Sequence, residues 1–292
     1  MTRLHPNILS IGASGKHAGL VVPELVRHGA RVRGFVRDPS KRDEVLARGA
    51  SEVAIGDLRD SASLDAALEG IEGVFYLCPA FHPDETQLGL NVVDSAKRAG
   101  VKRFVFSSVL HPQISRMKHH IAKLLVEDAI KQSGMEYTVL QPASFYQNMA
   151  NFWPAVVKTK TFSLPIASDK AWAFVDYRDV AEIAALALTS DRLVYGTFEL
   201  CCEDNLNRER IATIMSEVLH EKIAVESPSF STWAARNRLP YSLEPGPAKM
   251  FEAMNAYYND HGFPGNSLIL RAILGREPRS LKSYLYELAR GV

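Results

Sequence analysis

The chain has few cysteines and no excess of charge of either sign. Its three cysteines are Cys78 and the adjacent pair Cys201 and Cys202, which we expect within one strand. An odd count without disulfide-like spacing excludes a disulfide-stapled secreted domain and predicts a reducing, cytoplasmic location. Lysine and arginine number 34 against 33 for aspartate and glutamate, so nothing in the composition favours direct binding to nucleic acid.

Long apolar runs are also missing. No stretch is long enough to span a bilayer, and the first residues show no apolar signal region, so we predict no membrane association. Apolar residues make up 47% and charged residues 23% of the 292 residues, which is ordinary for a globular protein. This length allows one large α/β domain with an appended lobe, as a monomer or a homodimer.

Strand-like and helix-like segments alternate through the first half of the chain. Near-continuous apolar strands separated by helices predict a doubly wound, Rossmann-like parallel sheet over residues 1–142. The predicted strands cover residues 8–11, 31–36, 52–55, 73–77, 103–108 and 136–140. Residues 143–292 are less regular and predict a smaller mixed α+β lobe, interleaved with the first domain and not independent of it.

A glycine-rich turn follows the first predicted strand and opens directly into a helical pattern. Its spacing is Gly12-x-x-Gly15-x-x-Ala18, which departs from the G-x-G-x-x-G form of dinucleotide sites. Such a turn lets the backbone approach a pyrophosphate and offers helix N-terminal N–H groups to it, although an ordinary turn has the same glycines. The predicted phosphate-binding residues are Gly12, Ser14, Gly15, Lys16 and His17.

Basic residues follow the second predicted strand. Arg37 comes directly after the apolar run, and Lys41 lies about one helical turn later. At this place an arginine accommodates a 2′-phosphate, whereas a carboxylate bonds the ribose hydroxyls of NAD. The pair therefore favours NADP, while the neighbouring Asp38 leaves NAD open and a solvated basic turn would bind neither.

Further residues lie where other predicted strands end. Because ligands of open parallel sheets bind outside the carboxyl ends of the strands, we expect these residues to line the same cofactor site. They are Asp57, Leu58, Cys78, Pro79, Ser107 and Pro142.

The predicted helix over residues 117–132 carries His119 and Lys123, four positions apart and on one face. A lysine here can bond the nicotinamide ribose, and the alternative is a solvent-facing side chain. His111, His119 and His120 lie close in sequence, but no carboxylate or cysteine has metal-ligand spacing among them, so we predict no metal site.

Taken in order, these motifs resemble the NmrA-like family of atypical short-chain dehydrogenase/reductases over nearly the whole chain. The matching pieces are the Gly12-x-x-Gly15-x-x-Ala18 turn, residues 36–41, 56–58, 101–108, His119-x-x-x-Lys123, and residues 137–148, 174–181 and 274–279. The resemblance implies a Rossmann-like domain with a small C-terminal lobe and NAD(P) bound to it.

The resemblance also implies a catalytic pair, since short-chain dehydrogenases use Tyr-x-x-x-Lys. Lys123 matches the lysine of this pair, while His119 stands at the tyrosine position. The proton for a reduced carbonyl would then come from His119, Tyr146, His111 or solvent. Some members of the family resemble NAD(P) sensors that dock onto transcription factors.

Aromatic residues are frequent in residues 145–153, and Trp172 and Phe174 follow later. They suit a flat apolar substrate if they face the nicotinamide, and otherwise form ordinary core packing. We therefore predict an NADP(H)-dependent oxidoreductase that reduces an apolar carbonyl or a quinone-like small molecule. The alternatives are a non-catalytic NAD(P)(H) redox sensor that regulates a protein partner, and a structural subunit with a vestigial nucleotide site.

Overall fold

A computed structural model describes residues 5–79, 81–202, 205–237 and 245–291. The chain forms two compact units, the first made of residues 1–113, 119–141 and 177–198 and the second of 114–118, 142–176 and 199–292. The chain therefore passes between the units several times, and the predicted boundary after residue 142 stays a prediction. No helix within the described ranges is long and apolar enough to cross a membrane.

A seven-stranded sheet forms the centre of the first unit. Its strands are β1 (Asn7–Ile11), β2 (Arg31–Val36), β3 (Glu52–Ile55), β4 (Gly73–Leu77), β5 (Arg103–Ser107), β6 (Glu136–Pro142) and β10 (Gly196–Leu200). The spatial order is β10-β6-β5-β4-β1-β2-β3, and the pairs from β3 through β6 are parallel. Strand order reverses between β1 and β4, which confirms the predicted doubly wound fold.

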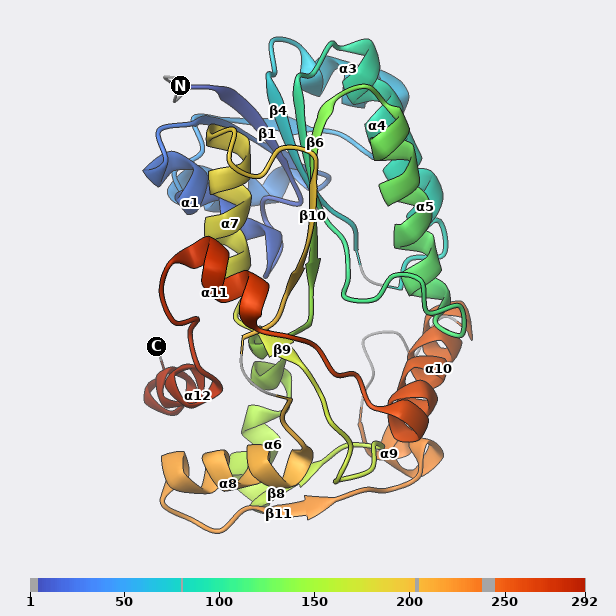
Figure 1. Ribbon diagram of the computed structural model, residues 1–292, viewed down its shortest axis with the longest axis vertical. Helices are drawn as coiled ribbons and strands as arrows, with labels where there is room; N and C mark the ends of the chain where they lie inside the picture. The colour runs from blue at the N-terminus through green and yellow to red at the C-terminus, as the bar shows by residue number, and fades with distance from the viewer. Residues whose placement is uncertain (1–4, 80, 203–204, 238–244, 292) are drawn as a thin grey trace. The chain divides into compact units, whose positions relative to one another are not determined.

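Helices cover both faces of this sheet, as Figure 1 shows. One face carries α1 (Val21–Arg27), which contacts α7 (Tyr177–Thr189), and the other carries α3 (Ser61–Leu68), α4 (Glu85–Arg98) and α5 (Lys118–Gln132). The remaining elements of this unit are η1 (Ala18–Leu20), η2 (Pro39–Lys41) and α2 (Arg42–Ala47). Burial on both faces explains why the central strands are apolar at nearly every position.

A glycine allows α4 and α5 to approach each other closely. A Cβ atom built on Gly89 of α4 would lie 2.4 Å from Cγ2 of Val126 on α5. One turn earlier, the Thr86 hydroxyl donates to the Ala122 carbonyl across the same contact, at 3.3 Å. This contact places the first turn of α4 against the first half of α5.

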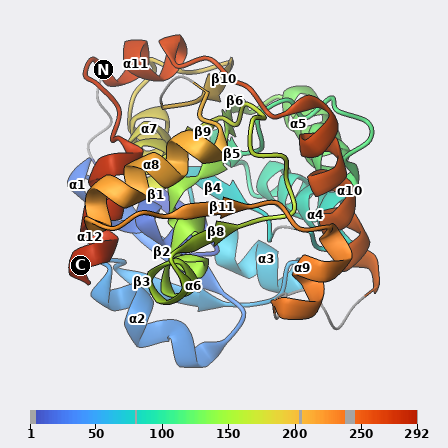
Figure 2. The same ribbon diagram turned by 90° about the horizontal axis from the view of Figure 1, so that it is seen from below.

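The second unit is a mixed α+β assembly, as predicted. Its strands form two small parallel sheets, β7 (Ser144–Phe145) with β9 (Phe174–Val175) and β8 (Thr161–Ser163) with β11 (Ala224–Glu226). Its helical elements are η3 (Tyr146–Asn151), α6 (Trp153–Thr159), α8 (Arg208–Leu219), α9 (Phe230–Arg236), α10 (Pro245–His261), α11 (Leu268–Leu274) and α12 (Leu281–Arg290). Figures 1 and 2 both show α8 beside α12 and β11, which it contacts.

A buried arginine connects segments of the second unit. The Arg208 guanidinium, on the first turn of α8, donates to the Glu226 carbonyl at 2.9 Å and also to the Ile166 carbonyl and the Ser227 hydroxyl. Such a charge keeps its place in a core only where hydrogen bonds replace its hydration. Arg208 therefore fixes β11 and the loop after β8 to α8.

The expectation that Cys201 and Cys202 lie within a strand is wrong. Strand β10 ends at Leu200, and both thiols are buried in the loop that follows it. The Cys202 N–H donates to the Phe174 carbonyl at 2.7 Å, and its sulfur accepts from the Asp176 N–H at 3.2 Å. The pair therefore anchors this loop to β9 instead of alternating across a sheet.

Replacing Gly89 by alanine should destabilise the protein by about 1–3 kcal/mol, because the new methyl group overlaps Val126 in a packed contact. The gain of helix propensity, roughly 1 kcal/mol, offsets part of this cost. Urea unfolding measures the difference. The matched control is Asp94→Ala on the exposed side of α4, which we expect to change stability by less than about 0.5 kcal/mol. Equal stability of both variants would refute the close helix contact.

Candidate functional site

The glycine-rich turn lies at the carboxyl end of β1. Gly12 has φ of +81°, a conformation that other residues adopt with strain, and its carbonyl accepts the Gly15 N–H at 2.7 Å. Gly15 and Lys16 are exposed, Ser14 is half-buried, and His17 places its ring 5.4 Å from that of Tyr177. The turn is therefore tightly closed, with its middle residues open to a ligand.

An arginine that the sequence did not indicate braces this turn. One nitrogen of Arg48, which follows α2, donates to the Ala13 carbonyl at 2.7 Å and to the Gly15 carbonyl at 3.2 Å. A Cβ atom built on Gly19 would collide with the same guanidinium. Gly19 thus leaves the space into which Arg48 fits, and a glycine directly before the predicted helix was the only signal in the sequence.

The basic residues after β2 lie close to this turn, because β1 and β2 are neighbours with Ile11 opposite Phe35. Arg37 is exposed and forms no ion pair with any residue in the described ranges. Lys41 is also exposed, and its ammonium lies 3.2 Å from a Glu44 carboxylate oxygen. Both cations are therefore accessible to an anion that binds beside the turn.

Asp38, which lies between these two basic residues in the sequence, caps a short helix. Its carboxylate accepts the Ser40 N–H at 2.9 Å and caps the short helix η2, a contact that holds the pKa of the carboxyl below its ordinary value. This contact engages one oxygen of an exposed carboxylate. That Arg37, and not Asp38, meets the adenosine ribose stays a prediction.

Asp57 and Leu58 lie directly after β3, in the order that the sequence predicted. The Asp57 carboxylate accepts the Arg59 N–H at 2.9 Å, which fixes the side chain in a tight turn. The Leu58 carbonyl accepts from the Asn91 amide of α4, also at 2.9 Å. Both residues are half-buried at the carboxyl edge of the sheet, beside the end of β2.

The ends of β4 and β5 are neighbours in the sheet, with Leu77 opposite Ser107. Ser107 is buried and its hydroxyl accepts from the Tyr177 hydroxyl at 3.0 Å. Cys78 is buried as well, and burial raises the pKa of its thiol to about 12, so the thiol stays protonated. Pro79 is exposed, and Pro142, the last residue of β6, belongs to the second unit.

Lys123 does not face solvent but forms a buried ion pair. Its ammonium contacts a carboxylate oxygen of Glu85 on the first turn of α4, and both side chains are less than a tenth exposed. Burial raises the pKa of Glu85, while the adjacent ammonium lowers it. Sequence reasoning missed Glu85, because an acidic residue in the first turn of a helix is ordinary.

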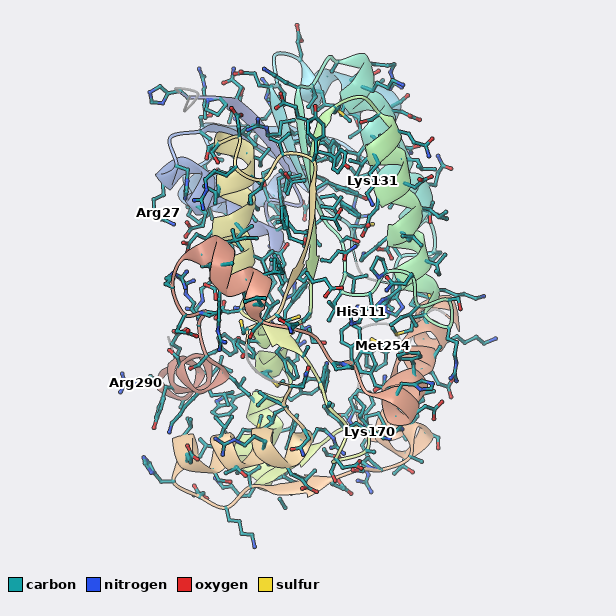
Figure 3. The ribbon with its side chains drawn as sticks, viewed as in Figure 1. Arg27, His111, Lys131, Lys170, Met254 and Arg290 are labelled. Carbon is teal, nitrogen blue, oxygen red and sulfur yellow. The ribbon has the colours of Figure 1, made fainter. Side chains whose placement is uncertain are left out.

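The histidines near Lys123 are buried and neutral. Burial, together with the charges of His120 and Lys123, lowers the pKa of His119 to about 2, and its ring lies 4.6 Å from that of Phe81. Burial lowers the pKa of His120 to about 4, and its Nδ1–H donates to the His111 carbonyl at 3.0 Å. Figure 3 labels His111 on the loop between β5 and α5.

Tyr146, the third proposed catalytic residue, lies in the second unit. Its ring is fully buried and stacks on Phe174 at 5.9 Å and on Tyr284 at 6.2 Å. Trp172 contacts Phe174 at 4.6 Å in the same group of rings. These contacts are core packing of the second unit, and a catalytic role of Tyr146 stays a prediction.

The structure thus gathers most of the predicted cofactor residues at one edge of the sheet of the first unit. Strands β3, β2, β1, β4 and β5 are adjacent and parallel, so the residues after each of them share that edge. Two charged residues that the sequence did not single out, Arg48 and Glu85, contact members of this set. The predicted roles of the individual residues stay predictions.

The neutral histidines predict how stability depends on pH. His119 and His120 have native pKa values below the ordinary 6.5, so the unfolded chain binds more protons. Their contribution is present above pH 6.5 and is lost as pH falls toward the native values. Each should cost about 2 kcal/mol between pH 7.5 and 5.0. Urea unfolding at both pH values measures this loss of stability. In each of the single variants His119→Gln and His120→Gln, the loss should be smaller by the contribution of one histidine. An undiminished pH dependence in both variants would mean that these imidazoles are accessible.

The chain is similar to several known proteins. The model of the NmrA-like family matches residues 5–285. A NAD(P)H azoreductase of Xenophilus azovorans is 35% identical over 62% of this chain and 63% of its own length. Quinone oxidoreductase 2 of Escherichia coli K12 is 24% identical over 92% of this chain and 94% of its own. The Citrobacter sp. triphenylmethane reductase, solved with NADP(H), superposes with a TM-score of 0.84 at 23% identity over 97% of this chain and 99% of its own. The predicted resemblance is confirmed: the chain belongs to the NmrA-like family.

Proposed function

We propose that this protein is an NADPH-dependent oxidoreductase that reduces a quinone-like or other conjugated aromatic acceptor. The relatives named above include an azoreductase, a quinone oxidoreductase and a triphenylmethane reductase, and the last was solved with NADP(H). The single observation that carries the choice of acceptor is the burial of His119 one helical turn before the buried Lys123 ammonium, which opposes protonation of the imidazole.

The residues present fit a dinucleotide. The turn closed by the Gly12 carbonyl leaves Ser14, Gly15 and Lys16 at or near the surface for the pyrophosphate. Arg37 and Lys41 supply exposed cations for a 2′-phosphate, which favours NADP over NAD. In this proposal Asp57 and Leu58 contact the adenine, and Cys78, Pro79, Ser107 and Pro142 line the remaining length of the cofactor.

When bound, NADPH supplies a hydride, and reduction of an ordinary carbonyl also requires a proton. An imidazole with a pKa near 2 is unprotonated at neutral pH, so His119 does not act as an imidazolium donor. The Cys78 thiol, with a pKa near 12, is a poor donor as well. Neither His119 nor Cys78 is therefore a strong general acid.

A weak acid is sufficient for one class of acceptor. A quinone that receives a hydride becomes a phenolate, whose charge is delocalised and which takes its proton from water. A simple ketone becomes an alkoxide, a far stronger base that needs an acid during the transfer. The lack of a strong acid beside Lys123 in the described structure thus favours quinones and dyes over simple aldehydes and ketones.

Arg37→Ala should weaken NADPH binding by about 10- to 100-fold, because a charge-assisted hydrogen bond to phosphate contributes about 1.5–3 kcal/mol. NADH lacks the 2′-phosphate, so its affinity should change little. Fluorescence titration with both cofactors measures the two dissociation constants.

The matched control is Arg27→Ala, which removes an equally exposed arginine from the last turn of α1 (Figure 3). We expect it to leave both affinities unchanged. Equal weakening of NADPH and NADH by Arg37→Ala would refute a 2′-phosphate contact at this position.

The purified wild-type protein should oxidise NADPH with a quinone, an azo dye and a triphenylmethane dye. With aliphatic aldehydes and ketones we expect a rate at least about 100-fold lower, because general acid catalysis contributes roughly 10²–10⁴-fold to such reductions. Absorbance of NADPH measures turnover across this panel.

The outcome also decides between the proposed enzyme and a redox sensor. Tight NADPH binding without turnover of any acceptor would exclude the reductase and support a sensor that regulates a protein partner. Efficient reduction of simple ketones would instead show that a competent proton donor is present, and would overturn the argument from His119.

A further inference from the structure

The ion pair between Glu85 and Lys123 is among the most deeply buried in the described chain. The Glu85 side chain is 2% exposed and that of Lys123 is 8% exposed. The second carboxylate oxygen, Oε2 of Glu85, is buried and has no hydrogen-bond partner among the described residues. Two charges are thus kept out of water with incomplete compensation, which lowers the stability of the folded protein. Such a cost is expected where the charges serve a purpose.

The location of the pair points to that purpose. Glu85 begins α4, shortly after β4, and Lys123 lies on α5, which follows β5. The order of strands reverses between β1 and β4, and ligands of doubly wound sheets bind at this reversal, outside the carboxyl ends of the strands. The pair is therefore built into elements that start at the proposed cofactor edge.

Two contacts between the helices hold the pair together. Gly89 lies one turn after Glu85 and makes room for Val126, while the Thr86 hydroxyl bonds the Ala122 carbonyl next to Lys123. Packing of the two helices thus places the residue that carries the carboxylate next to the helix that carries the lysine. A flexible lysine side chain is fixed most effectively by such a rigidly mounted anion.

Glu85 is also the anion that compensates Lys123 locally. Cys78, His119 and His120 are titratable groups that also interact with the ammonium. Burial keeps the thiol protonated and both imidazoles neutral, so none of the three carries negative charge at neutral pH. Removing the Glu85 charge would leave the ammonium buried among neutral groups.

We propose that Glu85 is a positioning residue, which holds the Lys123 ammonium where it bonds the nicotinamide ribose of the cofactor. This inference rests on the proposed NADPH site. Glu85 acts through Lys123 and does not itself take part in the transfer. The nicotinamide ribose is common to NADPH and NADH, so the effect of Glu85 is the same for both cofactors, in contrast to that of Arg37.

The test is a double-mutant cycle with E85Q, K123M and the double variant, in which Kd is measured for NADPH and for NADH. E85Q keeps the shape of the side chain and removes its charge. We expect it to raise both Kd values about tenfold, the size of one lost charge-assisted hydrogen bond. K123M should have a similar effect, and E85Q should add nothing in the K123M background.

The neighbouring carboxylate provides the matched control. Asp84 precedes Glu85 and is more than half exposed, so D84N removes the same charge one position away. It should leave both Kd values unchanged. If E85Q does not fold, as judged by urea unfolding, E85D takes its place in the cycle. It keeps the charge but withdraws it from the ammonium by one methylene group, so both Kd values should still rise.

Three results overturn the proposal: unchanged Kd values in a folded Glu85 variant, additive effects of the two substitutions, or a loss confined to NADPH. Each result is read from binding and is independent of turnover. Failure of the wild-type protein to reduce any acceptor would therefore refute the proposed enzyme without deciding the role of Glu85. Failure of the wild-type protein to bind either cofactor would refute both.

Discussion

The close contact between α4 and α5 is the constraint on which the proposed chemistry depends. Because Gly89 has no side chain, Val126 packs directly against the backbone of α4. This proximity brings a carboxylate and an ammonium together inside the protein, and their burial removes the water that would otherwise screen them. With a wider separation of the helices, the Lys123 side chain would not be held in one position, as is the case for exposed lysines.

A charged side chain likewise stabilises the glycine-rich turn at the proposed binding edge. Arg48 bonds two carbonyl groups of the turn from the side of α2, in the space left by Gly19. Backbone N–H groups bind a phosphate well only when they are already oriented, so a turn that is braced in advance loses less entropy on binding. The proposed binding edge is therefore supported by residues that need not touch the ligand.

The sequence predicted the fold because the fold depends on local patterns, and the proposed binding edge follows from the same patterns. Apolar strands that alternate with helices determine the sheet, and residues after consecutive parallel strands meet at one edge whatever the details of packing. Glu85, Arg48 and the burial of His119 depend instead on which helix faces approach each other. Such contacts join residues about 35 positions apart, for instance Ala13 with Arg48, and leave no periodic signal. The prediction for Cys201 and Cys202 was wrong for the same reason, since the hydrogen bonds of Cys202 to β9 and to the residue after it outweigh strand propensity.

The protonation of His119, the histidine at the tyrosine position, depends on the neighbouring Lys123. A tyrosine is a donor in its neutral form, and a neighbouring ammonium makes its phenol more acidic. A histidine in the same place becomes an effective acid only by accepting a proton, and the charge of Lys123 and burial both oppose this. In the proposed reductase, exchange of the two residue types removes the acid and retains the cation that is proposed to bind the ribose. In that proposal the position selects the acceptor by chemistry instead of shape: compounds that stabilise the arriving negative charge within their own conjugated system remain reducible, and those that need an acid do not.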